Sequence, residues 1–172
     1  VALVKEKDDY KYITKSEKTR KIDAATGQPL VFVNGFAKIK TYRGVGFINK
    51  DMKPLKITGR DATDFNENGI AAMEMEDGRL CYINTAGKEV FPADYDAVGA
   101  FSNGLAWVYS GGKYGFIDVN GHLVIKPVFD TVTDFRDSLA FVSLNNRFGA
   151  IKYAPGYSAP KISIGDYTLL DS

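Results

Sequence analysis

Residues 104–127 read GLAWVYSGGKYGFIDVNGHLVIKP, and this stretch decides the fold class. Its apolar residues recur with period two, and two turn pairs, Gly111-Gly112 and Asn120-Gly121, interrupt them. Such alternation predicts β-strands, and both pairs tolerate the positive φ of two-residue hairpin turns. The stretch therefore predicts a three-stranded antiparallel meander. Pro127 is expected to end its third strand, because proline has no backbone N–H to give to a ladder.

The two turns also predict how the strands pair. Each turn independently sorts small aliphatic residues onto one face of the sheet and aromatic residues onto the other. Both faces are apolar, so neighbouring sheets must cover them, and Gly115 is expected to let a bulky group of a neighbouring unit come close. The predicted opposite pairs are Ala106 with Ile117, Trp107 with Phe116, Val108 with Gly115, Tyr109 with Tyr114, Ile117 with Val124 and Phe116 with Ile125.

The same pattern recurs about every 35 residues. Each unit has an alanine in its first strand and an isoleucine in its second strand, and an aromatic residue stands in the linker before each of the last four units. Two independent anchors that keep one period through five units indicate a tandem repeat. The anchors are Ala2, Ala37, Ala71, Ala106 and Ala140, then Ile13, Ile48, Ile83, Ile117 and Ile151, with linker aromatics at Phe32, Phe65, Phe101 and Phe135.

These repeats predict the organisation of the chain. An open, curved β-superhelix of meanders and a closed, five-bladed propeller-like array can both stack such units. Propeller blades usually have four strands and about 40–45 residues, so the shorter period favours the open superhelix. The chain starts at Val1 without an initiator Met, as a processed or shortened chain does, and further repeats are expected before it. The predicted units lie near residues 1–31, 32–64, 65–100, 101–134 and 135–153, followed by a divergent C-terminal capping segment over residues 154–172.

The segment Lys113-Tyr114-Gly115-Phe116-Ile117-Asp118, with Ile125-Lys126-Pro127 after it, resembles the bacterial WG-repeat (KWG-repeat) family. The family signature is an aromatic-glycine pair, which here reads Tyr114-Gly115 and Phe148-Gly149. It weakens to Val45-Gly46 and is lost at Leu80-Cys81. The resemblance implies an all-β tandem-repeat protein that is often exported or surface-associated. It also implies a binding or interaction module without catalytic residues.

Composition narrows the function classes. Apolar residues make up 45% of the 172 residues and the net charge is +1, which suits a folded domain and gives no reason to expect nucleic-acid binding. No apolar run approaches the roughly 20 residues that a membrane helix needs. The charges are unevenly placed: residues 1–60 hold 14 Lys/Arg and 6 Asp/Glu, whereas residues 61–172 hold 8 and 15. In an open array these segments would be oppositely charged ends.

Few residues offer catalytic or metal chemistry. Cys81 shares the repeat phase of Gly46 and Gly115, so a buried, inert thiol is expected. His122 follows a turn pair and is expected to be exposed. With one cysteine and one histidine, zinc sites and Cys/His or Ser/His machinery are close to excluded, and no metal or cofactor is predicted.

Linker carboxylates are the remaining catalytic candidates. Paired carboxylates can perform glycosidase-type acid/base chemistry or bind calcium. However, Asp96 and Asp130 hold one repeat phase, which indicates residues that close a turn through their own backbone. The linker carboxylates are Asp94, Asp96, Asp130, Asp134 and Asp137.

Two groups of residues are candidate binding surfaces. Trp107, Tyr109 and Phe141 could form an aromatic platform for a sugar or a peptide, although the sequence favours packing between repeats as their role. Lys15, Lys18, Arg20 and Lys21 could dock an anionic partner, or form a solvated face. We predict a non-enzymatic binding or scaffold module for a protein or polysaccharide partner. The alternatives are a carboxylate-based glycan hydrolase and a structural spacer in a longer protein.

Overall fold

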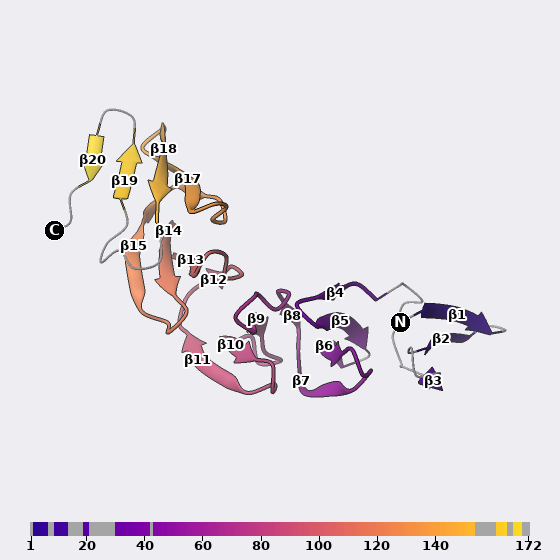
Figure 1. The fold of residues 1–172 in the computed structure, drawn as a ribbon. Helices are drawn as coiled ribbons and strands as arrows, with labels where there is room; N and C mark the ends of the chain where they lie inside the picture. The colour runs from indigo at the N-terminus through magenta and orange to yellow at the C-terminus, as the bar shows by residue number, and fades with distance from the viewer. Residues whose placement is uncertain are drawn as a thin grey trace. The chain divides into compact units, whose positions relative to one another are not determined.

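The computed structural model describes residues 2–6, 9–13, 19–20, 30–41, 43–153, 161–164 and 167–169, with side chains only over residues 30–40 and 43–153. All regular elements in these residues are β-strands, as the sequence predicts (Figure 1). The described part of the chain contains no helix of the length and hydrophobicity that a membrane span requires. The chain divides into two compact units, Val1–Val90 and Phe91–Ser172.

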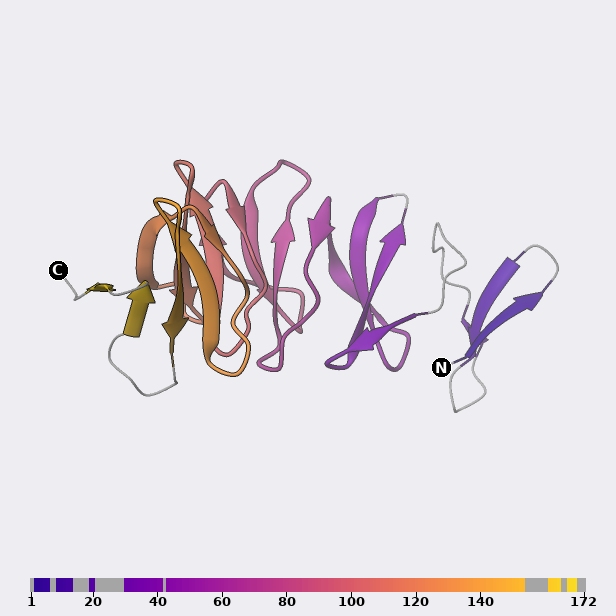
Figure 2. The same ribbon diagram turned by 90° about the horizontal axis from the view of Figure 1, so that it is seen from above.

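The described strands form five antiparallel sheets in chain order, which Figures 1 and 2 show from two directions. The first sheet contains β1 (Ala2–Glu6), β2 (Asp9–Ile13) and β3 (Thr19–Arg20). The second contains β4 (Phe32–Val33), β5 (Phe36–Thr41), β6 (Gly44–Asn49) and β7 (Pro54–Gly59). The third contains β8 (Asp61–Ala62), β9 (Ile70–Glu74), β10 (Leu80–Asn84) and β11 (Glu89–Ala93). The fourth contains β12 (Ala97–Val98), β13 (Leu105–Ser110), β14 (Lys113–Asp118) and β15 (Leu123–Phe129). The fifth contains β16 (Thr131–Val132), β17 (Leu139–Leu144), β18 (Arg147–Lys152), β19 (Lys161–Ile164) and β20 (Tyr167–Leu169).

The second, third and fourth sheets have four strands rather than the three that the sequence predicts. The additional strand is a two-residue segment of the linker, which pairs with the alanine-bearing strand on its free edge. In the fourth sheet, for example, Val98 of β12 lies opposite Val108 of β13. Two residues are too short to show period-two alternation, so the sequence pattern could not reveal this strand.

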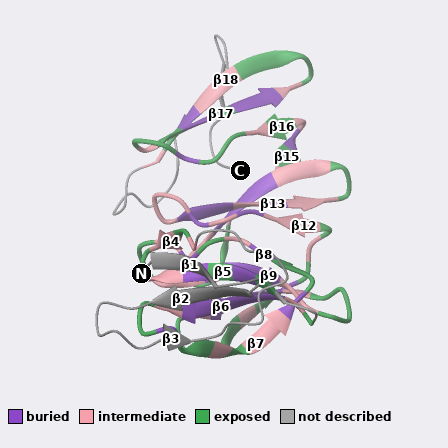
Figure 3. Ribbon diagram, turned by 90° about the vertical axis from the view of Figure 1, so that its right-hand side faces the viewer, coloured by how far each residue is buried: buried purple, intermediate pink, exposed green. Residues whose placement is uncertain are grey.

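The predicted register of the main hairpins is confirmed. Each alanine anchor lies directly opposite the isoleucine anchor of its own repeat, in all five sheets. Trp107 lies opposite Phe116, and both residues of the Gly111-Gly112 turn have positive φ, 58° and 84°. The two period anchors are therefore one cross-strand pair, and the described members of this pair in the second to fifth sheets are all buried (Figure 3).

The second hairpin of the fourth sheet departs from the prediction. Phe116 lies opposite Ile125 as expected, but Ile117 lies opposite Leu123 instead of Val124. The connection spans three residues, because the N–H of Asp118 bonds to the carbonyl of His122 and only Gly121 has positive φ, at 84°. Such loops carry a bulge that shifts the register by one residue.

Pro127 does not end its strand, contrary to the prediction, since β15 continues to Phe129. Proline is tolerated there because the ladder is already interrupted by a bulge opposite Gly115. A Cβ on Gly115 would lie 2.7 Å from the Pro127 nitrogen and 2.8 Å from the Lys126 carbonyl carbon. Gly115 is thus required by the third strand of its own sheet, not by a neighbouring unit as expected.

Two junctions between sheets show how the apolar faces are covered. In the first unit, Val45 and Phe47 of the second sheet pack against the small-residue face of the third sheet, which carries Ala71, Met73, Cys81 and Ile83. In the second unit, Leu105 and Phe116 of the fourth sheet pack against Ala140, Val142 and Ile151 of the fifth. Linker aromatics fill both junctions: the Phe65 ring centroid lies 4.6 Å from that of Phe47, and the Phe135 centroid 5.1 Å from that of Phe116.

Candidate functional site

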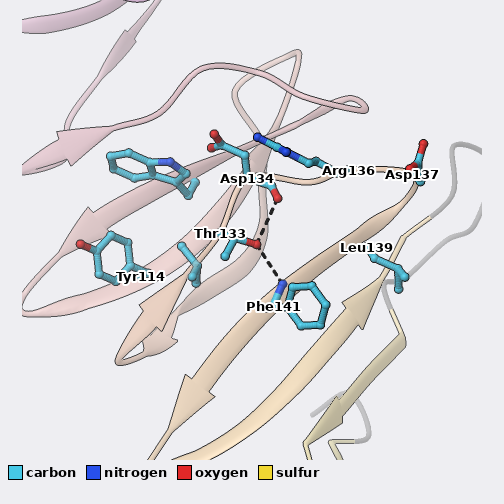
Figure 4. Close-up of a pocket in the computed structure, with 9 residues that line it drawn as sticks. Tyr114, Thr133, Asp134, Arg136, Asp137, Leu139 and Phe141 are labelled. Carbon is cyan, nitrogen blue, oxygen red and sulfur yellow. Dashed lines mark hydrogen bonds between the residues drawn. The ribbon is translucent and has the colours of Figure 1, made fainter.

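A pocket of about 690 Å³ lies in the second unit, where the linker before β17 crosses the junction of the fourth and fifth sheets (Figure 4). Its wall combines aromatic rings with charged side chains, which is the composition of a binding site with an apolar surface and a few orienting polar groups. It is lined by Trp107, Tyr114, Val132, Thr133, Asp134, Arg136, Asp137, Leu139 and Phe141.

Trp107 is held against the backbone of Gly99. A Cβ on Gly99 would lie 2.7 Å from the indole Cδ1, so only glycine leaves room for the ring. The indole also meets the Tyr114 ring edge to face, with centroids 5.7 Å apart. Glycine and tyrosine together fix the orientation of the ring, which lowers the entropy that a ligand would lose by ordering it.

The repeats show that Gly99 is a departure from a pattern. The residue in its phase is Thr63 in the third sheet and Thr133 in the fifth. There the threonine hydroxyl accepts the backbone N–H of Ala72 (2.9 Å) and of Phe141 (3.0 Å), the second shown in Figure 4. The fourth sheet replaces this threonine with glycine and has tryptophan in the phase of Ala72 and Phe141. The two replacements are sterically linked, because the ring occupies the space that a side chain at residue 99 would take.

A tight turn presents the charged rim of the pocket. The backbone N–H and carbonyl groups of Arg136 and Leu139 bond to each other, with N–O distances of 2.7 and 2.9 Å. Between them Asp137 and Ser138 have φ values of 49° and 66°, in a turn whose counterpart in the fourth sheet is Asn103-Gly104. In Figure 4 Arg136 lies between Asp134 and Asp137, so the two carboxylates do not face each other.

The structure brings together some of the predicted platform residues. Trp107 and Phe141 both line the pocket, and Phe141 is 66% exposed. Tyr109 is not among the lining residues; its ring packs on that of Tyr114, with centroids 4.6 Å apart. Trp107 also packs against the buried core of the second unit, which is the packing between repeats that the sequence left open as the alternative to a platform.

The predicted basic surface lies largely outside the described residues. This applies to Lys15, Lys18 and Lys21. Arg20 is described by its backbone alone, in β3, where it lies opposite Tyr12.

The linker carboxylates Asp96 and Asp130 bind turn amides, although not those of their own turns as expected. Asp96 Oδ2 accepts the N–H of Gly111 (3.0 Å), and Asp130 Oδ2 accepts that of Asn145 (2.7 Å). Each carboxylate thus closes the tip of the main hairpin of its sheet. A hydrogen bond from the Lys113 ammonium to Oδ1, aided by the Asn145 N–H, holds the pKa of Asp130 below its usual value.

Cys81 and His122 lie where the sequence predicts. Cys81 is buried in the core of the first unit, and burial raises the pKa of its thiol, which makes the reactive thiolate scarce. His122 is exposed and its ring nitrogen lies 3.2 Å from Asp118 Oδ2. Within the described residues, no three His, Cys, Asp or Glu side chains gather in a way that could hold a metal ion.

Sequence reasoning did not single out Gly99, Tyr114 or Arg136 as site residues. A signal for Gly99 was present, since threonine occupies its phase in the repeats on either side. Arg136 carried no such signal, because its place on the rim depends on the turn that follows it.

Comparison with known families agrees with this repeat architecture. The model of the WG containing repeat matches the chain twice in succession, over residues 82–114 and 114–148. Residues 82–148 are WG repeats. The two matches meet at Tyr114, and the strands from β11 to β17 lie within the matched range. No curated protein sequence matches the chain.

Solved structures resemble the chain at the level of fold. Hsv2 from Kluyveromyces lactis matches with a TM-score of 0.52 and 10% identity, over 73% of this chain and 44% of that protein. BamB from Moraxella catarrhalis matches with a TM-score of 0.47 and 11% identity, over 88% of this chain and 60% of that one. The chain therefore spans less than two thirds of the length of either protein.

Proposed function

We propose that this chain is a non-enzymatic binding module that recognises a polysaccharide or protein partner, with the pocket at Trp107 as its contact surface. The single observation that carries this proposal is the coupled replacement at Gly99 and Trp107. A repeat that needs only to pack has no reason to exchange a hydrogen-bonding threonine for a glycine that accommodates a partly exposed indole.

A polysaccharide suits the pocket better than a protein. A sugar ring has a flat C–H face that packs on an aromatic ring, and hydroxyl groups at its edge that bond to carboxylates and guanidinium groups. The pocket offers this combination, with Trp107 beside Asp134 and Arg136. A folded protein partner would need a larger contact area than one pocket supplies.

The environment of the carboxylates supports the non-enzymatic part of the proposal. Asp96 and Asp130 accept backbone N–H groups of hairpin turns, which is a structural role. Asp134 and Asp137 do not face one another in the pocket, whereas a glycosidase places two carboxyl groups across the bond to be cleaved (Figure 4).

The open curved arrangement of the sheets and a location outside the bacterial cytoplasm belong to the same proposal. The repeat period of 34 or 35 residues supports the first, and the resemblance to WG-repeat proteins supports the second. Small-angle X-ray scattering tests the arrangement, because an open array gives a larger radius of gyration than a closed ring of the same mass.

Intrinsic fluorescence tests the binding proposal directly, since Trp107 is the only tryptophan in the chain. We expect a glycan array to identify a ligand class, and a soluble oligosaccharide of that class to change the intensity or wavelength of Trp107 emission. Gly99→Ala should weaken binding about tenfold, equivalent to about 1.4 kcal/mol. Gly46→Ala is the matched control, because its new Cβ would meet other atoms at an ordinary 3.5 Å. Absence of any glycan that changes the emission contradicts the polysaccharide assignment.

A further inference from the structure

The outer face of the fifth sheet exposes three large apolar side chains. Leu139 is 41% exposed, Phe141 66% and Phe148 80%. They come from the adjacent strands β17 and β18, and they hold the repeat phases of Leu105, Trp107 and Tyr114 in the fourth sheet. Leu105 is only 1% exposed. Such a patch on one sheet face is the mark of an interaction surface.

The chain itself shows what covers a face of this kind. Leu105 and Phe116 of the fourth sheet are covered by Ala140, Val142 and Ile151. In the first unit, Val45 and Phe47 are covered by the corresponding small-residue face of the third sheet. The complement is therefore specific in shape: an alanine and a small apolar residue on one strand, opposite an isoleucine on the next.

The described C-terminal strands do not supply that complement. β19 pairs with β18, placing Ile162 opposite Ile151, and β20 pairs with β19. A strand that is hydrogen-bonded at an edge extends the sheet, whereas covering the face would require a second layer. These strands therefore lengthen the fifth sheet without closing its outer face.

We propose that this face binds the first sheet of a second copy of the chain, so that the copies associate head to tail. Ala2, Val4 and Ile13 hold the repeat phases of Ala140, Val142 and Ile151. Ala2 also lies opposite Ile13, the same register as in the sheet that covers the preceding aromatic face. The first sheet thus carries the sequence of the complement in the same register.

Charge does not oppose this contact. Residues 131–172 hold four Lys/Arg and four Asp/Glu, so the fifth sheet and the residues after it have no net charge to repel a positively charged partner. The first 60 residues have an excess of eight positive charges, 14 Lys/Arg against 6 Asp/Glu. Because the two contacting faces differ, the interface is heterologous, and it generates growing assemblies instead of a closed dimer.

Sedimentation velocity over a range of concentrations tests the association. We expect the unmodified chain to form a series of species that grows beyond the dimer. Phe148→Glu should leave only monomer, because it places a carboxylate at the most exposed of the three apolar side chains of the face. Val128→Glu is the matched control: this residue is an exposed valine, 39% accessible, on β15, and the variant should associate like the parent. A parent chain that remains monomeric, or a Phe148→Glu variant that still associates, overturns the proposal.

Cysteine cross-linking tests the orientation. Ala150 lies opposite Phe141 on the same face. A mixture of Ala2→Cys and Ala150→Cys chains should form disulfide-linked dimers. Cross-linking of Ala150→Cys only to itself would show a tail-to-tail dimer, and an internal disulfide in a monomeric double variant would show ring closure; either result overturns the second-copy proposal. Trp107→Ala should not affect assembly, so failure here is distinguishable from failure of the glycan-binding proposal.

Discussion

The junctions of the second with the third sheet and of the fourth with the fifth have the same core but different surfaces. In the first of these, Lys38 donates a hydrogen bond from Nζ to the carbonyl of Ala62 (2.7 Å) and lies 4.0 Å from Asp64 Oδ1. In the second, the residue in the phase of Lys38 is Trp107, and Asp134 holds the phase of Asp64 on the rim of the pocket. One lysine ties the linker to the sheet at the first junction, whereas the second junction presents an aromatic ring. The residue after the alanine anchor is thus where the repeat can vary without loss of the fold.

Replacing the linker aromatics tests whether the two cores are equivalent, and it has the largest expected effect. Phe65 and Phe135 are each 1% exposed and pack on an aromatic ring of the preceding sheet. Phe65→Ala and Phe135→Ala should each lower the free energy of unfolding by about 3–5 kcal/mol, through lost transfer energy and a residual cavity. Urea denaturation followed by circular dichroism measures this. A loss below about 1 kcal/mol in one variant only would show that the two junctions are packed differently.

Replacing the glycine at one position of the repeat with alanine should change stability by different amounts in the two units. Gly46 and Gly115 are counterparts, but a Cβ at residue 46 meets its neighbours at 3.5 Å, whereas one at residue 115 meets backbone at 2.7 Å. Gly115→Ala should cost about 1–3 kcal/mol, since the bulged third strand must shift. Gly46→Ala should change stability by less than about 0.5 kcal/mol. Equal losses of stability in the two variants would show that the bulged third strand is not the reason for glycine at residue 115.

These glycines also show what the sequence predicts well and what it does not. The pairing of Ala106 with Ile117 could be read from the alternation and the turn pair alone, because register depends on local rules. The bulge opposite Gly115 could not, since nothing near Pro127 in the sequence distinguishes a strand end from an interrupted ladder.

The pocket was harder to predict than the fold, for a physical reason. Trp107 and Phe141 could be identified as aromatic residues at one repeat phase. Their common pocket depends on the linker before β17, whose path follows from the turn at Asp137-Ser138. Neither residue of that turn is the glycine that usually marks such a conformation, so the sequence signal was weak.

Trp107→Lys gives the junction of the fourth and fifth sheets the residue type that Lys38 supplies at the junction of the second and third. The new ammonium should reach the linker carbonyl or Asp134, as Lys38 reaches Ala62 and lies near Asp64. We expect partner binding to fall at least tenfold, with a stability loss smaller than that of Phe135→Ala, because Trp107 is only half-buried. Calorimetric titration measures the affinity, since this variant lacks the fluorescent indole. Unchanged affinity would place the partner elsewhere.

The smallest expected effect is a dependence of stability on pH that arises in the second unit only. Asp130 holds the repeat phase of Arg60 in the first unit, so only the second unit has a carboxylate at this position. The hydrogen bond from Lys113 and the N–H of Asn145 lower the pKa of Asp130 below its ordinary value of 3.8. Its ionised form therefore stabilises the fold above about pH 4, and this contribution disappears as the pH falls through the lowered pKa.

Asp130→Asn should accordingly lower the melting temperature slightly at pH 7, and the difference from the parent should shrink as the pH falls below about 4. Thermal denaturation between pH 7 and pH 2 measures both effects, and Asp96→Asn is the comparison, since Asp96 also accepts a hairpin N–H. The exposed position and the screening of the ion pair by salt keep the effect small. A difference that stays constant down to pH 2 would assign the role of Asp130 to the shape of its side chain, and the contrast with Arg60 would then not be electrostatic.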